Sequence, residues 1–287
     1  MNHLTRLAGA LLLCLAAPGA LALDFTRKED QLAGYIKLRG DLSGQETFAD
    51  FHIDVYGVLP GERPQLLFKL DGFNVGKFVK EGERWLFLSR ELALYRDAKT
   101  GGVLERWPNP YTGQENAVVQ VQNDPVNQTY DLSSPRLAFK FDDYGSDLLF
   151  KVDVPLRYPN PLPPQQFPEE SGGAFYSGME SFTFFADKAQ VHDASKTSAA
   201  TRYVWFRYGP WLPWMKMGER PGFLLYTGHG RKHADFAALD AVLREAVDKQ
   251  YPLYRHAPQT LVSPNETSWT FYRKLKTGAS PEGKGKP

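Results

Sequence analysis

Residues 205–218 read Trp205-Phe206-Arg207-Tyr208-Gly209-Pro210-Trp211-Leu212-Pro213-Trp214-Met215-Lys216-Met217-Gly218. Proline has no backbone N–H and disfavours helical backbone at the preceding residue, so the two prolines exclude a continuous helix here. Three tryptophans and two methionines nevertheless have to be buried against something. We therefore expect this Trp-Met segment either to fill or seal the protein's own core or to line a cavity for an apolar ligand.

Segments with apolar residues at alternate positions lie on both sides of the Trp-Met segment. Successive side chains of a strand point to opposite faces, so such alternation predicts half-buried strands. The predicted strands are 36–39, 51–56, 66–70, 85–88, 92–95, 103–107, 118–122, 136–142, 148–154, 181–186, 201–208 and 223–227. Turn sequences at 71–72, 97–102 and 143–145 are typical of tight connections between them. These features predict a mainly β protein, a single antiparallel β-barrel resembling the lipocalins in architecture.

One segment has the spacing of an amphipathic helix. Between Asp235 and Gln250 the apolar residues fall on one helical face, namely Phe236, Leu239, Leu243 and Val247. Asp235 is a suitable N-cap and Pro252 ends the segment. We expect this single C-terminal helix to lie across the barrel wall or to plug one end.

The N-terminus has the features of an export signal. Arg6 supplies a positive charge, residues 7–18 are apolar, and Ala20-Leu21-Ala22 is a small-residue cleavage site. We predict a signal peptide at 1–22 cleaved after Ala22, one domain at 23–275, and a disordered basic tail at 276–287. Localisation is then periplasmic or secreted. The single cysteine, Cys14, lies within the signal, so the predicted mature chain carries no thiol or disulfide.

Composition narrows the classes of partner. The net charge is +1 and the only concentration of basic residues is the C-terminal tail, so we predict no nucleic-acid partner. The apolar N-terminal run is too short for a transmembrane helix. Phosphate-loop and dinucleotide fingerprints are absent from the sequence, and the histidines are too scattered to predict a metal site, so we predict no cofactor and no metal.

Several residues are candidates for a ligand site. The aromatic and sulfur side chains predicted to line it are Trp85, Trp205, Trp211, Trp214, Met215, Tyr176 and Tyr111. Arg39 is predicted to orient a ligand. Glu180 shares a strand face with two phenylalanines, and burial of a carboxyl among rings raises its pKa and suits it to proton transfer. His52 lies between two aspartates on one strand face and is the second candidate proton carrier. The alternatives are an ion pair of Glu180 with Arg39 or Arg207 and a solvent-facing position for His52.

Three stretches carry a resemblance to a known family. They are Lys37-Leu38-Arg39-Gly40 with the following strand to Tyr56-Gly57; Arg106-Trp107-Pro108-Asn109-Pro110-Tyr111-Thr112-Gly113; and Pro210-Trp211-Leu212-Pro213-Trp214-Met215 with Met217-Gly218, Arg220-Pro221-Gly222, Leu224-Leu225-Tyr226 and Gly230-Arg231-Lys232. On these motifs the chain resembles a widespread secreted bacterial and fungal family known only as a domain of unknown function. The resemblance implies a shared fold and export, and it implies no reaction and no catalytic residue.

Three functions are compatible with these observations. The first is an exported barrel that binds a hydrophobic or aromatic small molecule in its interior. The second is an isomerase, cyclase or lyase that acts on an apolar substrate with Glu180 or His52 as proton carrier, which requires a titratable residue inside the cavity. The third is a structural or interaction protein of the cell envelope, with a filled interior and an exposed apolar patch around Trp211 and Trp214.

Overall fold

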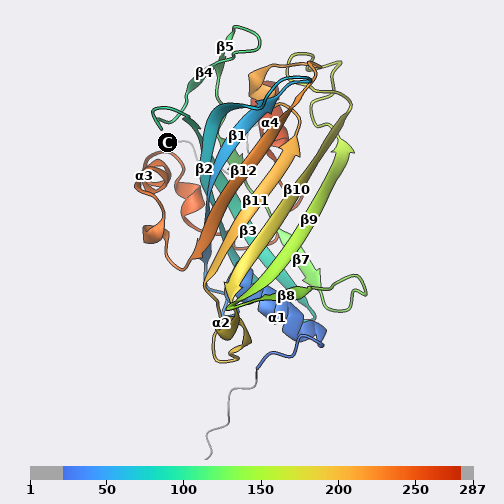
Figure 1. Ribbon diagram of the computed structural model, residues 1–287, viewed down its shortest axis with the longest axis vertical. Coiled ribbons are helices and arrows are strands. Elements are labelled where there is room, and N and C mark those ends of the chain that lie inside the picture. Colours follow the sequence, from blue (N-terminus) through green and yellow to red (C-terminus); the bar gives the residue numbers. More distant parts are fainter. Residues whose placement is uncertain (1–21, 279–287) are drawn as a thin grey trace, which may run out of the picture.

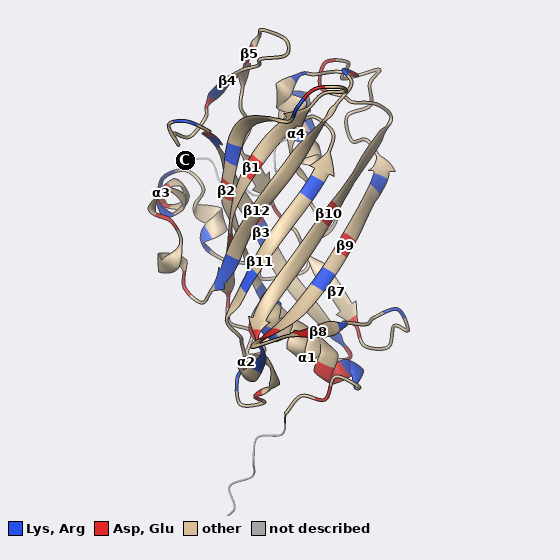
Figure 2. Cartoon of the chain, in the orientation of Figure 1, with Lys and Arg blue, Asp and Glu red and all other residues tan. Residues whose placement is uncertain are grey.

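The computed structural model of the protein describes residues 22–278. The predicted signal peptide, apart from Ala22, and the tail beyond Gly278 lie outside the described residues. None of the described helices is long and apolar enough to cross a bilayer. Basic and acidic residues are interspersed along the elements in the view of Figure 2.

One large antiparallel sheet forms most of the molecule (Figure 1). Its strands run in the order β6-β3-β2-β1-β12-β11-β10-β9-β8, and β7 also pairs with β3. Their bounds are β1 Thr47–Val58, β2 Gln65–Glu81, β3 Arg84–Asp97, β6 Val121–Asn123, β7 Gln128–Asp131, β8 Phe141–Tyr144, β9 Asp147–Pro159, β10 Phe175–Asp187, β11 Thr201–Gly209 and β12 Phe223–His233. A separate hairpin pairs β4 Arg106–Pro108 with β5 Glu115–Ala117. The predicted mainly β, antiparallel fold is confirmed.

The sheet is curved, and its two ends are not joined by strand pairing. Among residues 22–278, no pairing links β8 to β6 or β7. Closure by hydrogen bonds into a barrel is therefore not part of the described fold. Instead, α1 (Lys28–Arg39) packs inside one end of the curve, and α4 (Ser268–Thr277) contacts β6 near the other.

Residues 36–39 belong to α1, so the strand predicted there is wrong. Leu32, Tyr35 and Ile36 share a buried face at helical spacing, and the apparent alternation of Ile36 and Leu38 covers only one helical turn. Acidic residues in the first turn and basic residues in the last turn favour this helix through its dipole.

The predicted C-terminal helix is present as α3 (Ala241–Lys249), but it starts later than predicted. Phe236–Ala238 is a short 3-10 turn, η2, and the Asp235 side chain makes no capping hydrogen bond there. Leu243 and Val247 pack on Phe48 and Phe73. Alternation along β1 places Phe48 on the face opposite Phe51, so α3 covers the outer face of the sheet.

The described chain holds helices beyond the single one predicted. Besides α1 and α4, they are α2 Lys188–His192, the 3-10 turn η1 Pro213–Met215 and the 3-10 turn η3 Pro252–Arg255. Thr267 caps α4 through a reciprocal hydrogen-bond pair with Thr270, and Gly278 closes it in the left-handed region at φ 68°. The helix therefore continues into the first two residues of the predicted disordered tail.

Several strands are longer than predicted. Asp71 and Gly72 lie inside β2 rather than in a turn, because Gly72 lacks the Cβ that would collide with Phe51 and Ala93 on adjacent strands. The segments 85–88 and 92–95 form one strand, β3. The predicted connection at 97–102 is correct, since it joins Arg96 and Val103 in an antiparallel bridge.

Candidate functional site

The inner face of the curved sheet borders a cavity of about 390 Å³. Strands β1, β2, β3, β9, β10, β11 and β12 all contribute inward-facing side chains to it. On β3 the alternate residues Phe87, Ser89, Glu91, Ala93 and Tyr95 face this space, as the period of a strand requires. Its volume falls within the range of pockets that hold small organic ligands.

Glu180 and Arg207 lie opposite each other on β10 and β11 and face the cavity. Arg207 Nε lies 3.6 Å from Glu180 Oε1, and Arg207 Nη2 donates a hydrogen bond to the Tyr176 hydroxyl. The Arg207 guanidinium also lies over the rings of Tyr226 and Trp269, at 5.2 and 5.8 Å from their centroids. It also lies 5.8 Å from the centroid of Tyr176, so Arg207 is held by a carboxylate, a hydroxyl and three rings.

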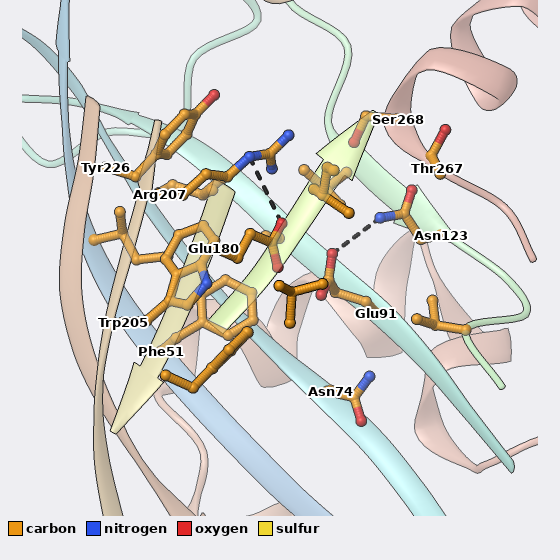
Figure 3. A pocket seen from close by; sticks show the side chains of 18 of the residues that line it. Phe51, Asn74, Glu91, Asn123, Glu180, Trp205, Arg207, Tyr226, Thr267 and Ser268 are labelled. Atoms are coloured by element: carbon orange, nitrogen blue, oxygen red, sulfur yellow. Dashed lines mark hydrogen bonds and ion pairs between the residues drawn. The ribbon is translucent and has the colours of Figure 1, made fainter. Parts of the chain in front are cut away.

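Glu91 faces the same space from β3 (Figure 3). Its Oε1 accepts a hydrogen bond of 2.9 Å from Asn123 Nδ2, and no salt bridge to it occurs among residues 22–278. Burial, reinforced by the charge of Glu180, raises the pKa of Glu91 to about 7. The two carboxyl groups in this cavity therefore have different partners, since Glu180 is paired with an arginine and Glu91 is hydrogen-bonded to an amide.

The wall next to β6 comes from α4 and the residues before it. Thr267, Ser268 and Trp269 line the cavity. Trp269 packs edge-on against Tyr176 at a centroid distance of 4.9 Å. Two nearly buried glutamates hold this helix, because Lys274 Nζ lies 2.8 Å from Glu266 and Lys276 Nζ lies 2.8 Å from Glu170.

Four predicted site residues border the cavity: Arg39, Tyr176, Glu180 and Trp205. Of the two ion pairs suggested for Glu180, the structure shows the one with Arg207. Trp205 is partly buried, and within the described part of the chain its indole Nε1 has no hydrogen-bond partner.

Trp211, Trp214 and Met215 do not line the cavity, which corrects the prediction of a ligand wall there. They are at most 5 % exposed and belong to a core cluster at one end of the sheet. Trp214 packs on Tyr95 at 5.2 Å and on Trp107 at 5.7 Å. The alternative reading of the Trp-Met segment as core is the one that the packing shows for these three residues.

Hydrogen bonds fix this core in place. Asn109 Nδ2 and Asn116 Nδ2 each donate to the Met215 carbonyl oxygen at 2.8 Å. Tyr111 packs on Trp211 at 5.4 Å and does not reach the cavity. The motif at 106–113 and the motif that begins at Pro210 therefore pack together in one core.

Trp85 also lies outside the cavity lining, where it packs beside the cluster formed by α1. Trp85 and Tyr111 are thus aromatic residues of the packed ends rather than of the cavity wall.

His52 lies on the outer face of the sheet, so its predicted place inside the cavity is wrong. Its neighbours Phe51 and Ile53 face inward, and alternation turns His52 outward. Its Nδ1 lies 3.1 Å from Asp71 Oδ1, and this hydrogen bond raises the pKa of the His52 imidazole. The histidine is part of a largely buried network on the outer face of the sheet.

Sequence reasoning missed Glu91, the second cavity carboxyl. A signal was present, because Glu91 alternates along β3 with the apolar residues Phe87, Ala93 and Tyr95. A charged residue on the same face of a strand as buried neighbours must either be buried itself or face a cavity.

An exposed apolar groove lies on the outer face. It is lined by side chains of β10, β11 and β12, including Phe175, Phe206, Tyr208 and Phe223. The exposed apolar surface thus differs from the patch predicted around Trp211 and Trp214, which are buried.

The fold and the cavity define a mainly β protein whose curved antiparallel sheet surrounds a space of small-molecule size. The family model described as "Protein of unknown function (DUF1838)" matches residues 44–276, and the chain belongs to this family. The family resemblance read from the sequence is therefore confirmed. A search of curated proteins found no match.

Proposed function

We propose that the protein binds a small, largely apolar or aromatic molecule in this cavity and transfers protons to and from the bound molecule. The sheet and its helices would form a lipocalin-like container around the ligand. The binding part rests on a cavity walled by rings such as Phe51, Phe182 and Trp205. The catalytic part rests on one observation: two carboxyl groups, Glu91 and Glu180, face this space with different partners. A protein that only binds and carries an apolar ligand needs neither carboxyl group.

The chemistry follows from these partners. Glu91, with its pKa raised to about 7, can donate a proton to a carbonyl or hydroxyl oxygen of the ligand. Glu180 can accept a proton from a neighbouring carbon, and Arg207 fixes its orientation. Removal of a proton at one atom and delivery at another is an isomerisation, and loss of a protonated oxygen is a lyase step. We therefore place the activity in the isomerase, cyclase or lyase class, in an exported protein.

The first test is binding. Aromatic and polycyclic ketones and alcohols are titrated while tryptophan fluorescence is recorded, and α-tetralone is the reference probe. Saturable quenching is expected, and Trp205→Phe should remove most of it because Trp205 borders the cavity. If no member of the panel gives saturable quenching, the cavity has no role in binding.

The second test is proton transfer. Deuterium incorporation beside the carbonyl of bound α-tetralone is followed by NMR in deuterium oxide. Glu91→Gln and Glu180→Gln should each slow exchange by roughly 10²- to 10⁴-fold while affinity stays within about threefold. His52→Gln is the matched control, since this titratable group lies on the outer face and should leave exchange unchanged. Equal exchange by wild type and both glutamate variants would exclude the catalytic part and leave a binding protein.

A further inference from the structure

Arg39 is a cavity-lining cation that no carboxylate balances. It is the last residue of α1, and its guanidinium lies 5.5 Å from the centroid of Phe87 and 5.3 Å from that of Phe184. Among residues 22–278, no carboxylate oxygen lies within salt-bridge distance of it. The tyrosine hydroxyls around it, of Tyr35, Tyr130 and Tyr203, supply dipoles and no formal charge.

The other charges that border the cavity are already matched. Glu180 pairs with Arg207, and Glu266 pairs with Lys274. Glu91 is the one remaining carboxyl among the described residues of the lining, and it is hydrogen-bonded to Asn123 and forms no salt bridge with Arg39. The lining therefore carries one uncompensated positive charge, which is costly in a site of low polarity.

On the basis of the proposed function, we infer that the natural ligand is an amphipathic monoanion, an aromatic or polycyclic acid whose carboxylate or similar oxyanion pairs with Arg39. Guanidinium groups bind such oxyanions through two parallel N–H bonds. The ligand's apolar body would lie along Phe182 and Trp205.

The strands also set the length of this ligand. Phe87 and Glu91 are four residues apart on β3, as are Phe184 and Glu180 on β10, which corresponds to roughly 13 Å along a strand. The rings beside Arg39 and the two carboxyls thus mark separate levels of the cavity. A ligand that spans them carries its anion at the α1 end and its reacting atoms near Glu91 and Glu180.

Two fluorescent probes of the same ring system test this inference. Anilinonaphthalene sulfonate carries one anionic group, and N-phenylnaphthylamine lacks it. Wild-type protein should bind the sulfonate roughly tenfold more tightly than the neutral amine, although the amine is the more apolar molecule. Energy transfer from Trp205, lost in Trp205→Phe, identifies the bound probe as occupying the cavity.

Arg39→Gln should weaken sulfonate binding roughly tenfold and change amine binding by less than about twofold. Arg157→Gln is the matched control, because Arg157 stacks over Phe175 at 4.5 Å beside the outer groove. It should change neither affinity in the cavity. Even if Arg39→Gln does not fold, the affinities of the wild-type protein for the two probes test whether the cavity prefers an anionic ligand.

The outcomes separate the two proposals. If both probes enter the cavity with equal affinity and Arg39→Gln affects them equally, the anionic ligand is excluded and the proposed cavity function stands. If Arg157→Gln alone weakens the sulfonate, the probe occupies the outer groove and the inference is wrong. If neither probe shows energy transfer from Trp205, both proposals fail.

Discussion

Two clusters of charged residues lie on opposite faces of the same sheet, and they differ in how fully they are paired. On the outer face, Asp71 contacts His52 at 3.1 Å and Arg96 at 2.7 Å. Asp50 accepts a hydrogen bond of 2.9 Å from the backbone N–H of Arg231 and lies 2.7 Å from His233. Each carboxylate of this outer cluster has two partners, which is typical of a network that stabilises the fold.

The cavity cluster on the inner face is incompletely paired. Glu91 has one amide donor, and Arg39 has no carboxylate partner among the described residues. Burial of polar groups without full compensation lowers stability, so proteins keep such groups where a ligand or a reaction requires them. The comparison shows that pairing, rather than residue type, separates the two clusters, because both contain carboxylates and cations.

The largest expected effect is on the outer cluster. Asp71→Ala leaves Arg96 and His52 without their shared carboxylate, and we expect a loss of about 3 kcal/mol in the free energy of unfolding, measured with urea. Asp54→Ala is the control, since its pair with Lys69 is exposed and should change the free energy by less than about 1 kcal/mol. Loss of probe binding in a folded Asp71→Ala protein would show that the two clusters are not separate.

A smaller effect is expected for the pH dependence of stability. The native Glu91 carboxyl holds its proton up to about pH 7, whereas in the unfolded chain it releases it near its ordinary pKa of 4.5. The native state binds more protons over this interval, so the free energy of unfolding falls as pH rises, by about 2.5 kcal/mol between pH 5 and 8 from this group.

Urea unfolding at several pH values between about 5 and 8 measures this change. Glu91→Gln should flatten the profile by the amount that Glu91 contributes. His52→Gln should also flatten it, because a raised histidine pKa gives stability that is lost as pH rises through that pKa. A Glu91→Gln profile identical to wild type would show that Glu91 releases its proton as readily in the folded protein as in the unfolded chain.

The smallest expected effect concerns Tyr176. Tyr176→Phe removes the hydroxyl that accepts a hydrogen bond from Arg207, and the loss should be about 1.5 kcal/mol in the free energy of unfolding. The control is Tyr144→Phe, which alters an exposed ring. Equal stability of the two variants would mean that Glu180 and the stacked rings suffice to hold Arg207.

Alternation predicted most of the strands, because the period of a strand is visible over five or six residues. Of the strand predicted at 136–142, however, only Phe141 and Asp142 belong to a strand, β8. It failed at 36–39, where four residues fit a helical turn and a strand equally well. It also grouped Asp50, His52 and Asp54 correctly on one face without showing which face is inward. That choice depends on strands distant in the sequence, such as β12, which pairs with β1.

Part of the site was also predictable from the alternation of residues along the strands. Glu180 was found because phenylalanines share its face, and its pairing with Arg207 follows from the register of β10 and β11. Glu91 is not predicted, because alternation indicates two short segments, 85–88 and 92–95, and Glu91 lies between them in the inward-facing row of β3. The prediction for Trp211 and Trp214 is wrong because aromatic content alone does not distinguish a cavity wall from a core.

The position of α4 has a consequence for how the protein is made. Its residues lie beyond β12 in the chain, so the ribosome completes Glu91, Glu180 and Arg207 before it reaches the helix that supplies Trp269. A chain that stops before Glu266 would possess these charged groups without their last wall. The cavity is therefore expected to gain this wall only after the strands that carry Glu91, Glu180 and Arg207 have been made.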